Sequence, residues 1–475
     1  MALPVHEQDI PEFASHDNNH YAEDLAPLVI VEGFLSSTAP FLWGKFEDHL
    51  NAQREELGLQ GRRRVIFASV GPVSSLHDRA CELYYALRGG TVHYGWSHSL
   101  HHGHRPYGRT HTKGLYPSWS PSRPLHFLGH SMGGPTITTM LTLIREGFFE
   151  DNSDHLPPNP PLDDSMVASV TTVSAPFRGT GVVYDLGERT DAAPDVRVFS
   201  FGSFVTKFVY AIEYFSPLIP AAWKPDFHAE SRALSLHEQS FSEFVRMLFA
   251  GPGDEDWAQS KDATPWDCTF EAAADRDRIF WSLMPEGTSA TTGGKSRGRT
   301  WYRSYVSCMT EPRREVSRST AGVRHAPASW TQALDAGFLY FSSRSLGRFD
   351  YSTIRPAPEF RPPIGSVVEE ERRIPRPLKE YFANDGVVPV FSQWHPGECW
   401  PGVRCIHHDR DVADEPDIVI RLGEGRTKVE HLEKHHHLSI MPLWMGTDRQ
   451  RAFWRELGEW LEDVDEARGA LESNA

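Results

Sequence analysis

Short runs of apolar and β-branched residues recur along the chain, each bounded by glycine, proline or polar residues. They cover residues 27–31 (PLVIV), 64–70 (RVIFASV), 125–129 (LHFLG), 169–174 (SVTTVS) and 301–310 (WYRSYVSCMT). Runs of this length without polar alternation are typical of strands that are buried on both faces of a parallel sheet. The pattern therefore predicts five strands of a mostly parallel sheet.

Segments with apolar residues at helical spacing lie among these runs. Residues 74–87 and 135–149 are predicted helices, and residues 453–464 are predicted to belong to an amphipathic helix near the end of the chain. Strands that alternate with helices are typical of α/β proteins. Residues 180–257 break the alternation with aromatic-rich helical patterns, so we expect a helical insertion there.

These patterns divide the chain into five parts. We expect a flexible polar arm over residues 1–25 and the first part of the α/β core over residues 26–180. A helical cap or lid is expected over residues 181–300, the second part of the core over 301–468, and an acidic tail over 469–475. The cap is thus predicted to interrupt the core.

The charge balance narrows the range of partners. The 475 residues include 48 Lys and Arg against 64 Asp and Glu, for a formal net charge of −16. A surface of this sign repels polyanions, so nucleic acid is not an expected partner. No apolar run approaches the roughly 20 residues that cross a bilayer, so no transmembrane segment is expected. Residues 1–25 lack the features of a secretory signal, which favours a cytoplasmic location over a secreted one.

The sequence Gly-His-Ser-Met-Gly at residues 129–133 lies between a predicted strand and a predicted helix. In this context G-x-S-x-G acts as a nucleophile elbow, because small residues on both sides of the serine permit a sharp turn. Ser131 is therefore the candidate nucleophile. The backbone N–H of Met132 and that of Phe34, in the loop after the first predicted strand, are the candidate oxyanion donors.

A nucleophilic serine needs a histidine base and an acid that orients it, and in this fold class the chain order is serine, acid, histidine. Asp385 lies in an Asn-Asp-Gly turn beside an apolar run and is the candidate acid, although such a turn also forms without a catalytic role. A histidine-rich segment follows at residues 431–437. We select His437 as the base, because it lies just before the final helix, and His431 is the alternative.

A second histidine-rich segment covers residues 93–111. His98 and His104 lie on either side of a glycine-containing loop, and this spacing permits both side chains to bind one metal ion. Most histidine-rich loops are only solvated, so the spacing alone leaves both interpretations open.

Several sequence blocks together resemble the thermoalkalophilic bacterial lipases and the related staphylococcal-type triacylglycerol lipases. The blocks are DRACE at 78–82, GGTVHYG at 89–95, the spacing of His98 and His104, YGRT at 107–110, VTTVSAPFRGT at 170–180 and NDGVV at 384–388. The resemblance extends in patches from about residue 27 to residue 461. It implies an α/β-hydrolase fold, with a mostly parallel central sheet flanked by helices and an inserted helical cap or lid.

In that family two aspartates and two histidines hold a structural zinc ion. The resemblance places three ligands at Asp78, His98 and His104, around a zinc loop at residues 89–111. It places the fourth ligand at Asp267, in an aromatic–aspartate step of the cap. Such a Zn²⁺ would clamp the cap to the core, since four protein ligands leave no open coordination position.

Both aspartates also have a simpler interpretation. Ser75-x-x-Asp78 has the form of a capping box, and a Thr-Pro step before Asp267 is typical of the start of a helix. Asp275 and Asp277 are nearby alternatives to Asp267 as a ligand.

Two positions depart from the pattern of the family. The oxyanion loop usually begins with His-Gly, whereas this chain has Glu32-Gly33, which keeps the backbone donor and changes the packing of the loop. Some members bind Ca²⁺ through a glutamate near the catalytic histidine, but the matching residue here is Ser439 if His437 is the base. A Ca²⁺ site is therefore not expected, unless His431 is the base and Glu433 supplies the carboxylate.

The resemblance implies a serine hydrolase that cleaves carboxylic esters of neutral lipids through an acyl-enzyme, at an oil–water or membrane surface. Residues 201–223 are the candidate lid, or else a permanently packed cap helix. One alternative is a carboxylesterase or phospholipase with the same triad. Two others are a hydrolase that uses a catalytic zinc ion at His98 and His104, and a lipid-binding scaffold without catalysis.

Overall fold

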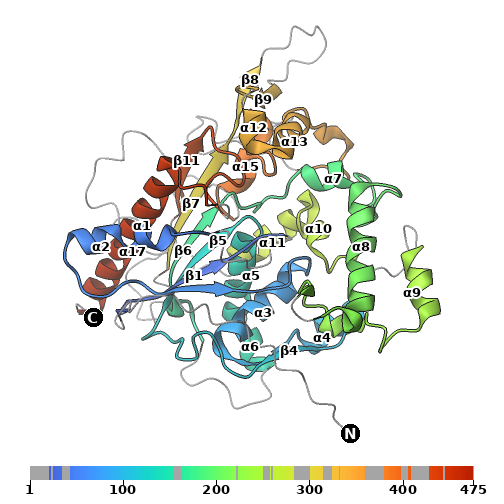
Figure 1. Ribbon diagram of the computed structural model, residues 1–475, viewed down its shortest axis with the longest axis horizontal. Coiled ribbons are helices and arrows are strands. Elements are labelled where there is room, and N and C mark those ends of the chain that lie inside the picture. The colour runs from blue at the N-terminus through green and yellow to red at the C-terminus, as the bar shows by residue number, and fades with distance from the viewer. Residues whose placement is uncertain are drawn as a thin grey trace.

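The computed structural model places one sheet of seven strands at the centre of the molecule (Figure 1). It describes residues 21–22, 25–34, 43–152, 162–220, 223–249, 257, 260–282, 300–313, 324–330, 332–358, 379–396, 405–407, 427–441 and 444–473. The strand order is β10–β11–β7–β6–β5–β1–β2, and each neighbouring pair is parallel. The predicted fold class, a mostly parallel sheet flanked by helices, is confirmed.

The five predicted strands are all present in this sheet, together with two more. The strands are β1 (Leu28–Val31), β2 (Val65–Ala68), β5 (Leu125–His130), β6 (Val167–Val173), β7 (Trp301–Cys308), β10 (Cys405–His407) and β11 (Thr427–Glu433). Every residue of β1, β5 and β6 is buried, as their continuous apolar runs require. β11, with the sequence TKVEHLE, lacks such a run, and its residue Glu430 forms an ion pair with Arg303 of β7.

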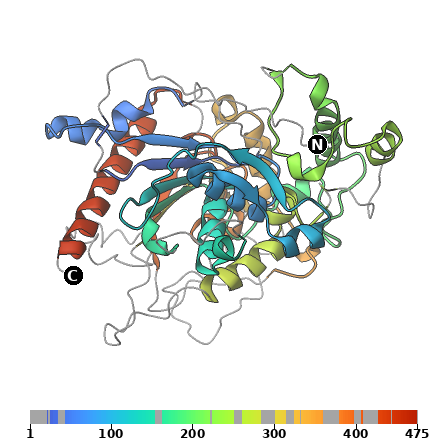
Figure 2. The same ribbon diagram turned by 90° about the horizontal axis from the view of Figure 1, so that it is seen from below.

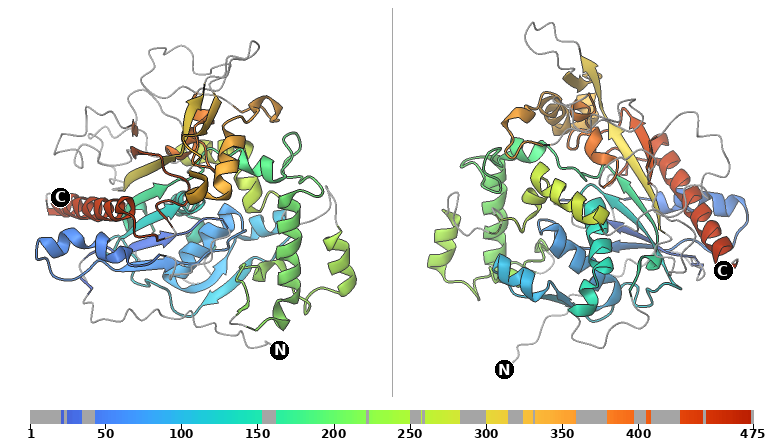
Figure 3. Two further views of the ribbon diagram at one scale, coloured as in Figure 1. Left: turned by 45° about the horizontal axis from the view of Figure 1, so that its top comes forward. Right: turned by 180° about the vertical axis from the view of Figure 1, so that it is seen from behind.

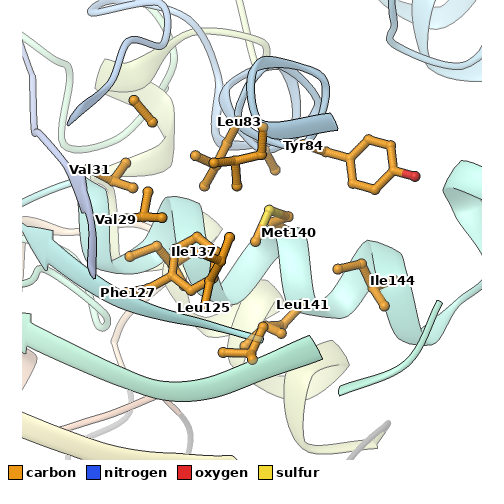
Figure 4. Close-up of a cluster of buried hydrophobic side chains, with 14 of the residues drawn as sticks. Val29, Val31, Leu83, Tyr84, Leu125, Phe127, Ile137, Met140, Leu141 and Ile144 are labelled. Carbon is orange, nitrogen blue, oxygen red and sulfur yellow. The ribbon is translucent and has the colours of Figure 1, made fainter. Parts of the chain in front are cut away.

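The helices α3 (Leu76–Arg88) and α5 (Gly133–Arg145) cover one face of the sheet. Figure 4 shows the contact between this face and the helices. The buried side chains include Val29 and Val31 of β1, Leu125 and Phe127 of β5, Leu83 and Tyr84 of α3, and Ile137, Met140, Leu141 and Ile144 of α5. Apolar residues at helical spacing in α5 thus complete the core that the strands begin.

The helices α1 (Phe46–Leu50) and α17 (Asp448–Ser473) cover the opposite face. Trp454, Leu457 and Leu461 of α17 pack in one buried cluster with Leu28 and Ile30 of β1. The predicted helix over residues 453–464 is part of α17. The observed helix continues to Ser473, so it includes most of the segment that we expected to be an acidic tail.

The described residues between β6 and β7 form helices joined by loops. These helices are α7 (Val182–Leu186), α8 (Phe201–Phe215), α9 (Phe241–Leu248), α10 (Thr264–Asp267) and α11 (Phe270–Ser282). Figures 1, 2 and 3 show α8 and α9 at one end of the molecule and α17 at the other. We refer to this insertion as the cap.

Ion pairs, one of them buried, join the cap to the core. His228 Nδ1 of the cap lies 2.8 Å from a carboxylate oxygen of Glu82 in α3, and both side chains are buried. Asp226 of the cap accepts two hydrogen bonds, of 2.7 and 2.8 Å, from the guanidinium of Arg109. Burial disfavours the charge on His228, but the carboxylates of Glu82 and Asp226 outweigh it and raise the pKa of His228 to about 9. The cap is therefore held on the core by charge as well as by apolar packing.

The remaining elements lie around the sheet. Two hairpins pair β3 (Gly90–His93) with β4 (Tyr107–His111) and β8 (Thr310–Arg313) with β9 (Arg324–Pro327). The other helices are α2 (Ala52–Glu56), α4 (Trp96–His102), α6 (Phe148–Asp151), α12 (Gln332–Ala336), α13 (Phe338–Leu346), α14 (Lys379–Phe382) and α15 (Val390–Gln393). Short 3₁₀ turns occur at Asp164–Met166, Ser216–Leu218, Glu230–Arg232 and Tyr351–Thr353.

Two of the expected segments lie wholly or partly outside the residues that the structure describes. Most of the expected arm over residues 1–25, and residues 474–475 of the expected tail, lie outside the described residues. Among the helices that are described, none combines the length and the hydropathy needed to cross a membrane.

The close approach of α17 to α1 gives a test of this packing. A Cβ added at Gly458 would lie 2.0 Å from the backbone oxygen of Leu50, whereas one added at Gly469 of the same helix would have no atom within 4 Å. Gly469→Ala should raise the free energy of unfolding by up to about 1 kcal/mol, because alanine favours the helix. Gly458→Ala should lower it by about 1–3 kcal/mol, because the added methyl group overpacks the interface. Urea denaturation of the two variants measures both changes, and equal effects at the two sites would contradict this packing.

Candidate active site and metal-binding group

Ser131 lies at the turn from β5 into α5, and its φ of 53° is unusual for a residue with a side chain. The backbone is crowded on both sides of the serine. A Cβ at Gly129 would lie 2.5 Å from the nitrogen of Gly134, and one at Gly133 would lie 2.0 Å from the oxygen of Val31. The two glycines thus permit the sharp turn that places the serine at the carboxyl end of the sheet, the geometry of a nucleophile elbow.

Asp385 and His437 are brought together from distant parts of the chain. His437 Nδ1 lies 2.9 Å from Asp385 Oδ2, and the backbone N–H of His437 donates to the backbone oxygen of Asp385 at 2.9 Å. Both residues are buried. The other oxygen of Asp385 accepts hydrogen bonds from the backbone N–H groups of Val387 and Val388, which fix the carboxylate within its own turn. A carboxylate on Nδ1 orients the ring so that Nε2 is the nitrogen that can accept a proton.

His431, the alternative base, lies within β11 and its side chain is exposed. The histidine of this segment that contacts Asp385 is His437.

Ser131 and His437 are further linked through His130, which precedes the serine. The Nε2 atom of His130 lies 2.9 Å from the backbone oxygen of His437, and the two imidazole rings pack with centroids 4.9 Å apart. Sequence reasoning gave this histidine no role, because the variable position of the G-x-S-x-G pattern carries no signal of its own.

The two candidate oxyanion donors, Phe34 and Met132, belong to segments that lie close to the serine. Met132 directly follows Ser131 and precedes the first residue of α5. Gly33, next to Phe34, lies so close that a Cβ on it would be 2.7 Å from the Cβ of Ser131. The loop after β1 therefore approaches the serine closely.

Glu32, the departure from the family pattern, is buried beside this loop. Its Oε1 accepts a hydrogen bond of 2.7 Å from the indole N–H of Trp43, and its backbone oxygen accepts one of 2.5 Å from Arg79. Burial raises the pKa of the Glu32 carboxyl to about 7, against the lowering effects of Trp43 and Arg79. Glu32 thus ties this loop to Trp43 through its side chain and to Arg79 of α3 through its backbone oxygen.

A cavity of about 760 Å³ lies between Ser131 and the cap. Its lining is mainly aliphatic and aromatic. The lining includes Phe34, Ser131 and Met132 of the core, Val182, Val183, Leu186, Val205, Val209, Tyr210, Met247 and Cys268 of the cap, and Val387 and Val388 beside Asp385. The arrangement can hold a largely apolar molecule next to a candidate nucleophile.

Asp78, His98, His104 and Asp262 form a second group, in which one ligand atom of each residue lies within 4.8 Å of the others. Asp78 lies on α3, His98 lies on α4, and His104 follows the left-handed turn at Gly103, where φ is 70°. His104 Nδ1 pairs with the backbone oxygen of Arg105 at 2.8 Å, which turns Nε2 toward the aspartates. The glycine-containing loop predicted from the spacing thus brings both rings to one point.

The donor atoms of this group are suited to a metal ion. Asp78 Oδ1, His98 Nε2, His104 Nε2 and Asp262 Oδ1 are all buried. His98 Nε2 lies 3.2 Å from Asp78 Oδ1 and from Asp262 Oδ1, but none of the four atoms makes a well-aligned hydrogen bond with a described residue. Buried polar atoms without a partner are rare in folded proteins, and one cation would satisfy all four. Two imidazole nitrogens and two carboxylate oxygens are a ligand set that Zn²⁺ accepts.

Arg232 of the cap holds the remaining oxygens of the two aspartates. Its Nη2 lies 2.7 Å from Asp78 Oδ2 and 2.5 Å from Asp262 Oδ2, and its guanidinium stacks on the ring of Trp257. Burial would raise the pKa of Asp262, but His98 and Arg232 lower it well below its usual range. Asp262 therefore remains ionised at the join between cap and core, paired with Arg232 and His98.

The fourth member of the group is Asp262, and the expectation of Asp267 was wrong. Asp267 Oδ2 accepts a hydrogen bond of 2.7 Å from the backbone N–H of Leu76, at the start of α3, and Oδ1 lies 3.2 Å from Arg276. It therefore stabilises a helix N-terminus, although the helix is α3 and not its own. Asp262 is placed beside Asp78 because an antiparallel bridge pairs Ala263 with Ser74. A contact between residues so far apart in the chain leaves no local sequence signal.

Comparisons with known proteins agree with this architecture. Residues 24–304 match the family described as "Lipase-like, C-terminal domain". The chain belongs to this lipase-like family. The resemblance drawn from the sequence blocks is confirmed.

Two curated members of the lipase-like group show the extent of the similarity. "Lipase 2" of Staphylococcus aureus is 40% identical over 170 residues, which are 32% of this chain and 24% of that protein. "Lipase" of Staphylococcus epidermidis is 28% identical over 305 residues, which are 60% of this chain and 39% of that protein. The matches therefore span between about a quarter and two-fifths of the length of these relatives.

Two solved structures share the fold over almost the whole chain. The Staphylococcus hyicus lipase has a TM-score of 0.59 at 20% identity and covers 96% of this chain and 99% of its own. Lipase 1 from Pelosinus fermentans has a TM-score of 0.54 at 24% identity and covers 92% of this chain and 98% of its own. The α/β-hydrolase type of fold thus extends to both parts of the core.

The assignment of Asp262, and not Asp267, as the fourth metal ligand can be tested by metal binding. Asp262→Asn should lower the affinity for Zn²⁺ by at least about tenfold, because even a change next to a ligand costs about 10–100-fold. Asp267→Asn should keep the affinity of the wild type and lose only stability at the start of α3. The measurements are zinc content after dialysis and competition with a chromophoric chelator. Loss of metal in Asp267→Asn with retention in Asp262→Asn would restore the original assignment.

Proposed function

We propose that the chain is a serine ester hydrolase that cleaves carboxylic esters of neutral lipids through an acyl-enzyme. The observation that carries the proposal is the buried pair of Asp385 and His437, 2.9 Å apart, joined to the elbow at Ser131. Nucleophile, acid and base follow one another along the chain in the order typical of this fold class. Membership of the lipase-like family supports the same chemistry.

In the proposed reaction the Oγ of Ser131 attacks the ester carbonyl carbon while His437 takes the serine proton at Nε2. Asp385 holds Nδ1–H and stabilises the imidazolium that forms. The N–H groups of Phe34 and Met132 bind the oxyanion, and one such donor contributes about 10²–10³ in rate. His437 then returns the proton to the leaving alcohol. Water, activated by the same base, releases the acid from Ser131.

The cavity favours a lipid ester over a small polar ester. Its lining is mainly apolar, and its volume of about 760 Å³ is sufficient for an acyl chain. The net charge of −16 disfavours a strongly anionic head group. A carboxylesterase or phospholipase activity of the same triad is the main alternative, and substrate comparison distinguishes the two.

We further propose that Asp78, His98, His104 and Asp262 hold Zn²⁺ in a structural site. With four protein ligands the ion would have no open position for water or substrate, so its contribution is to stabilise the contact between core and cap. Three ligands come from the core, namely Asp78 on α3, His98 on α4 and His104 just after α4, and Asp262 comes from the cap, which supports the role of a clamp.

The triad assignment predicts three defective variants and one control. Ser131→Ala, Asp385→Asn and His437→Gln should each lower kcat by about 10³-fold or more, because the three residues act as a unit. His431→Ala should retain the activity of the wild type. The measurement is release of fatty acid from a triacylglycerol emulsion, with a fluorophosphonate probe to label the serine.

Different results would select other functions. Activity that survives in Ser131→Ala would move the chemistry to the metal group. A folded wild-type protein that neither hydrolyses esters nor reacts with the probe would indicate a lipid-binding scaffold.

We propose that α8 is the part of the cap that meets lipid. Val205 and Val209 line the cavity on its inner side, whereas Phe204 and Phe208 are 66% and 55% exposed on its outer side. Exposed aromatic residues on an apolar helix are typical of surfaces that bind at a lipid interface. α8 thus presents apolar side chains both to the cavity and to solvent, which supports the interpretation of residues 201–223 as a lid.

The lid interpretation predicts a selective loss of activity. The double variant Phe204→Ser, Phe208→Ser should lower the rate on an emulsified triacylglycerol by about tenfold, since each lost aromatic contact weakens binding to the interface. The rate on a soluble short-chain ester should stay unchanged. Phe341→Ser, at an exposed position of α13 outside the cap, is the matched control. If the wild-type rate does not rise when the ester passes its solubility limit, interfacial opening is wrong.

A further inference from the structure

We infer that His130 is a positioning residue for the catalytic base, because its hydrogen bond to the backbone oxygen of His437 fixes the base relative to Ser131. This inference rests on the proposed function. It concerns a residue that would touch neither substrate nor the reacting atoms.

His437 itself takes part in three hydrogen bonds that hold it in place. Its backbone N–H and its Nδ1–H both donate to Asp385, each at 2.9 Å. Its backbone oxygen accepts from His130 at 2.9 Å. The contacts with Asp385 fix the base relative to the acid, and the contact with His130 fixes it relative to the strand that ends at the nucleophile.

The direction of this hydrogen bond is determined by its acceptor. A carbonyl oxygen can only accept, so Nε2 of His130 carries the proton and donates it. His130 is 3% exposed, and burial together with the neighbouring His437 lowers the pKa of its imidazole to about 3. The His130 ring is therefore neutral at neutral pH, and it donates this hydrogen bond in its neutral form.

The covalent geometry makes this link short. His130 is the last residue of β5 and Ser131 is the next residue, so one peptide unit separates the donor residue from the nucleophile. The acceptor residue is the base itself, although it lies 307 positions away in the sequence. Proton transfer between serine and histidine depends on their separation, and a displacement of about 1 Å can cost about 10²-fold in rate. The hydrogen bond from His130 to the backbone of His437 is a direct means of maintaining the distance between Ser131 and His437.

Two substitutions separate the hydrogen bond from the volume of the ring. His130→Phe keeps a planar ring and removes the donor. His130→Gln restores an N–H donor at about the position of Nε2. The matched control is His126→Phe, because His126 is a buried histidine of the same strand that instead pairs with Ser169 and Asp465.

The measurements are kcat and KM on a soluble ester, and the rate of labelling of Ser131 by a fluorophosphonate. Each rate is divided by the fraction of the protein that is folded and whose Ser131 the fluorophosphonate can label. His130→Phe should lower kcat and the labelling rate by about 10–100-fold, with KM changed by less than about threefold. His130→Gln should recover both rates to within about threefold of the wild type, and His126→Phe should match the wild type per folded site.

The possible results separate the inference from the function on which it rests. A wild-type protein that is folded but neither labelled nor active overturns the proposed function and the inference with it. An active wild type with His130→Phe equally fast per folded site overturns the inference alone. The inference also fails if His130→Gln is as slow as His130→Phe, because the ring and not the hydrogen bond would then matter.

Discussion

Parallel pairing of β5 between β1 and β6 is the constraint on which the proposed active site depends. Because all neighbouring strands of the sheet run in one direction, their carboxyl ends lie along the same edge. The turn at Ser131 follows β5, and the loop at Gly33 follows β1. His437 follows β11, on the far side of β7 and β6. β1, β5 and β6 are buried on both faces, so packing holds this part of the edge in place.

Close backbone approach is the second requirement at this edge. At Gly133, the start of α5 lies so close to the end of β1 that no side chain would fit. At Gly33, the backbone lies equally close to Ser131, and again no side chain would fit. These contacts need glycine because of space, and Ser131 itself accepts a strained φ of 53°. The strain is stored at the residue that the proposed reaction uses.

Charge, by contrast, determines how the cap meets the core. Asp78 and Asp262 face one another at this join, and Arg232 balances only the outward oxygens of the pair. The inward oxygens of both carboxylates lie 3.2 Å from His98 Nε2, and a bound cation would replace this ion pair with metal–ligand bonds from all four residues. A metal ion at this point would therefore stabilise the wall of the cavity that the cap provides. The buried pair of Glu82 and His228 supports the same join a short distance away.

The sequence by itself determined the fold class, the five central strands and the elbow at Ser131, because each of these follows from local periodicity or a short motif. It also indicated Asp385 and His437, whose chain order and turn chemistry are local features. Only the tertiary structure decided that Asp262 and not Asp267 faces the metal-binding group, since that depends on a strand-like bridge between segments nearly two hundred residues apart. The link from His130 to His437 was likewise undetectable, because a hydrogen bond to a backbone oxygen leaves no trace in the side chain of its acceptor. Local sequence patterns indicate the chemistry that a residue can perform, whereas tertiary packing determines which residues from distant parts of the chain it contacts.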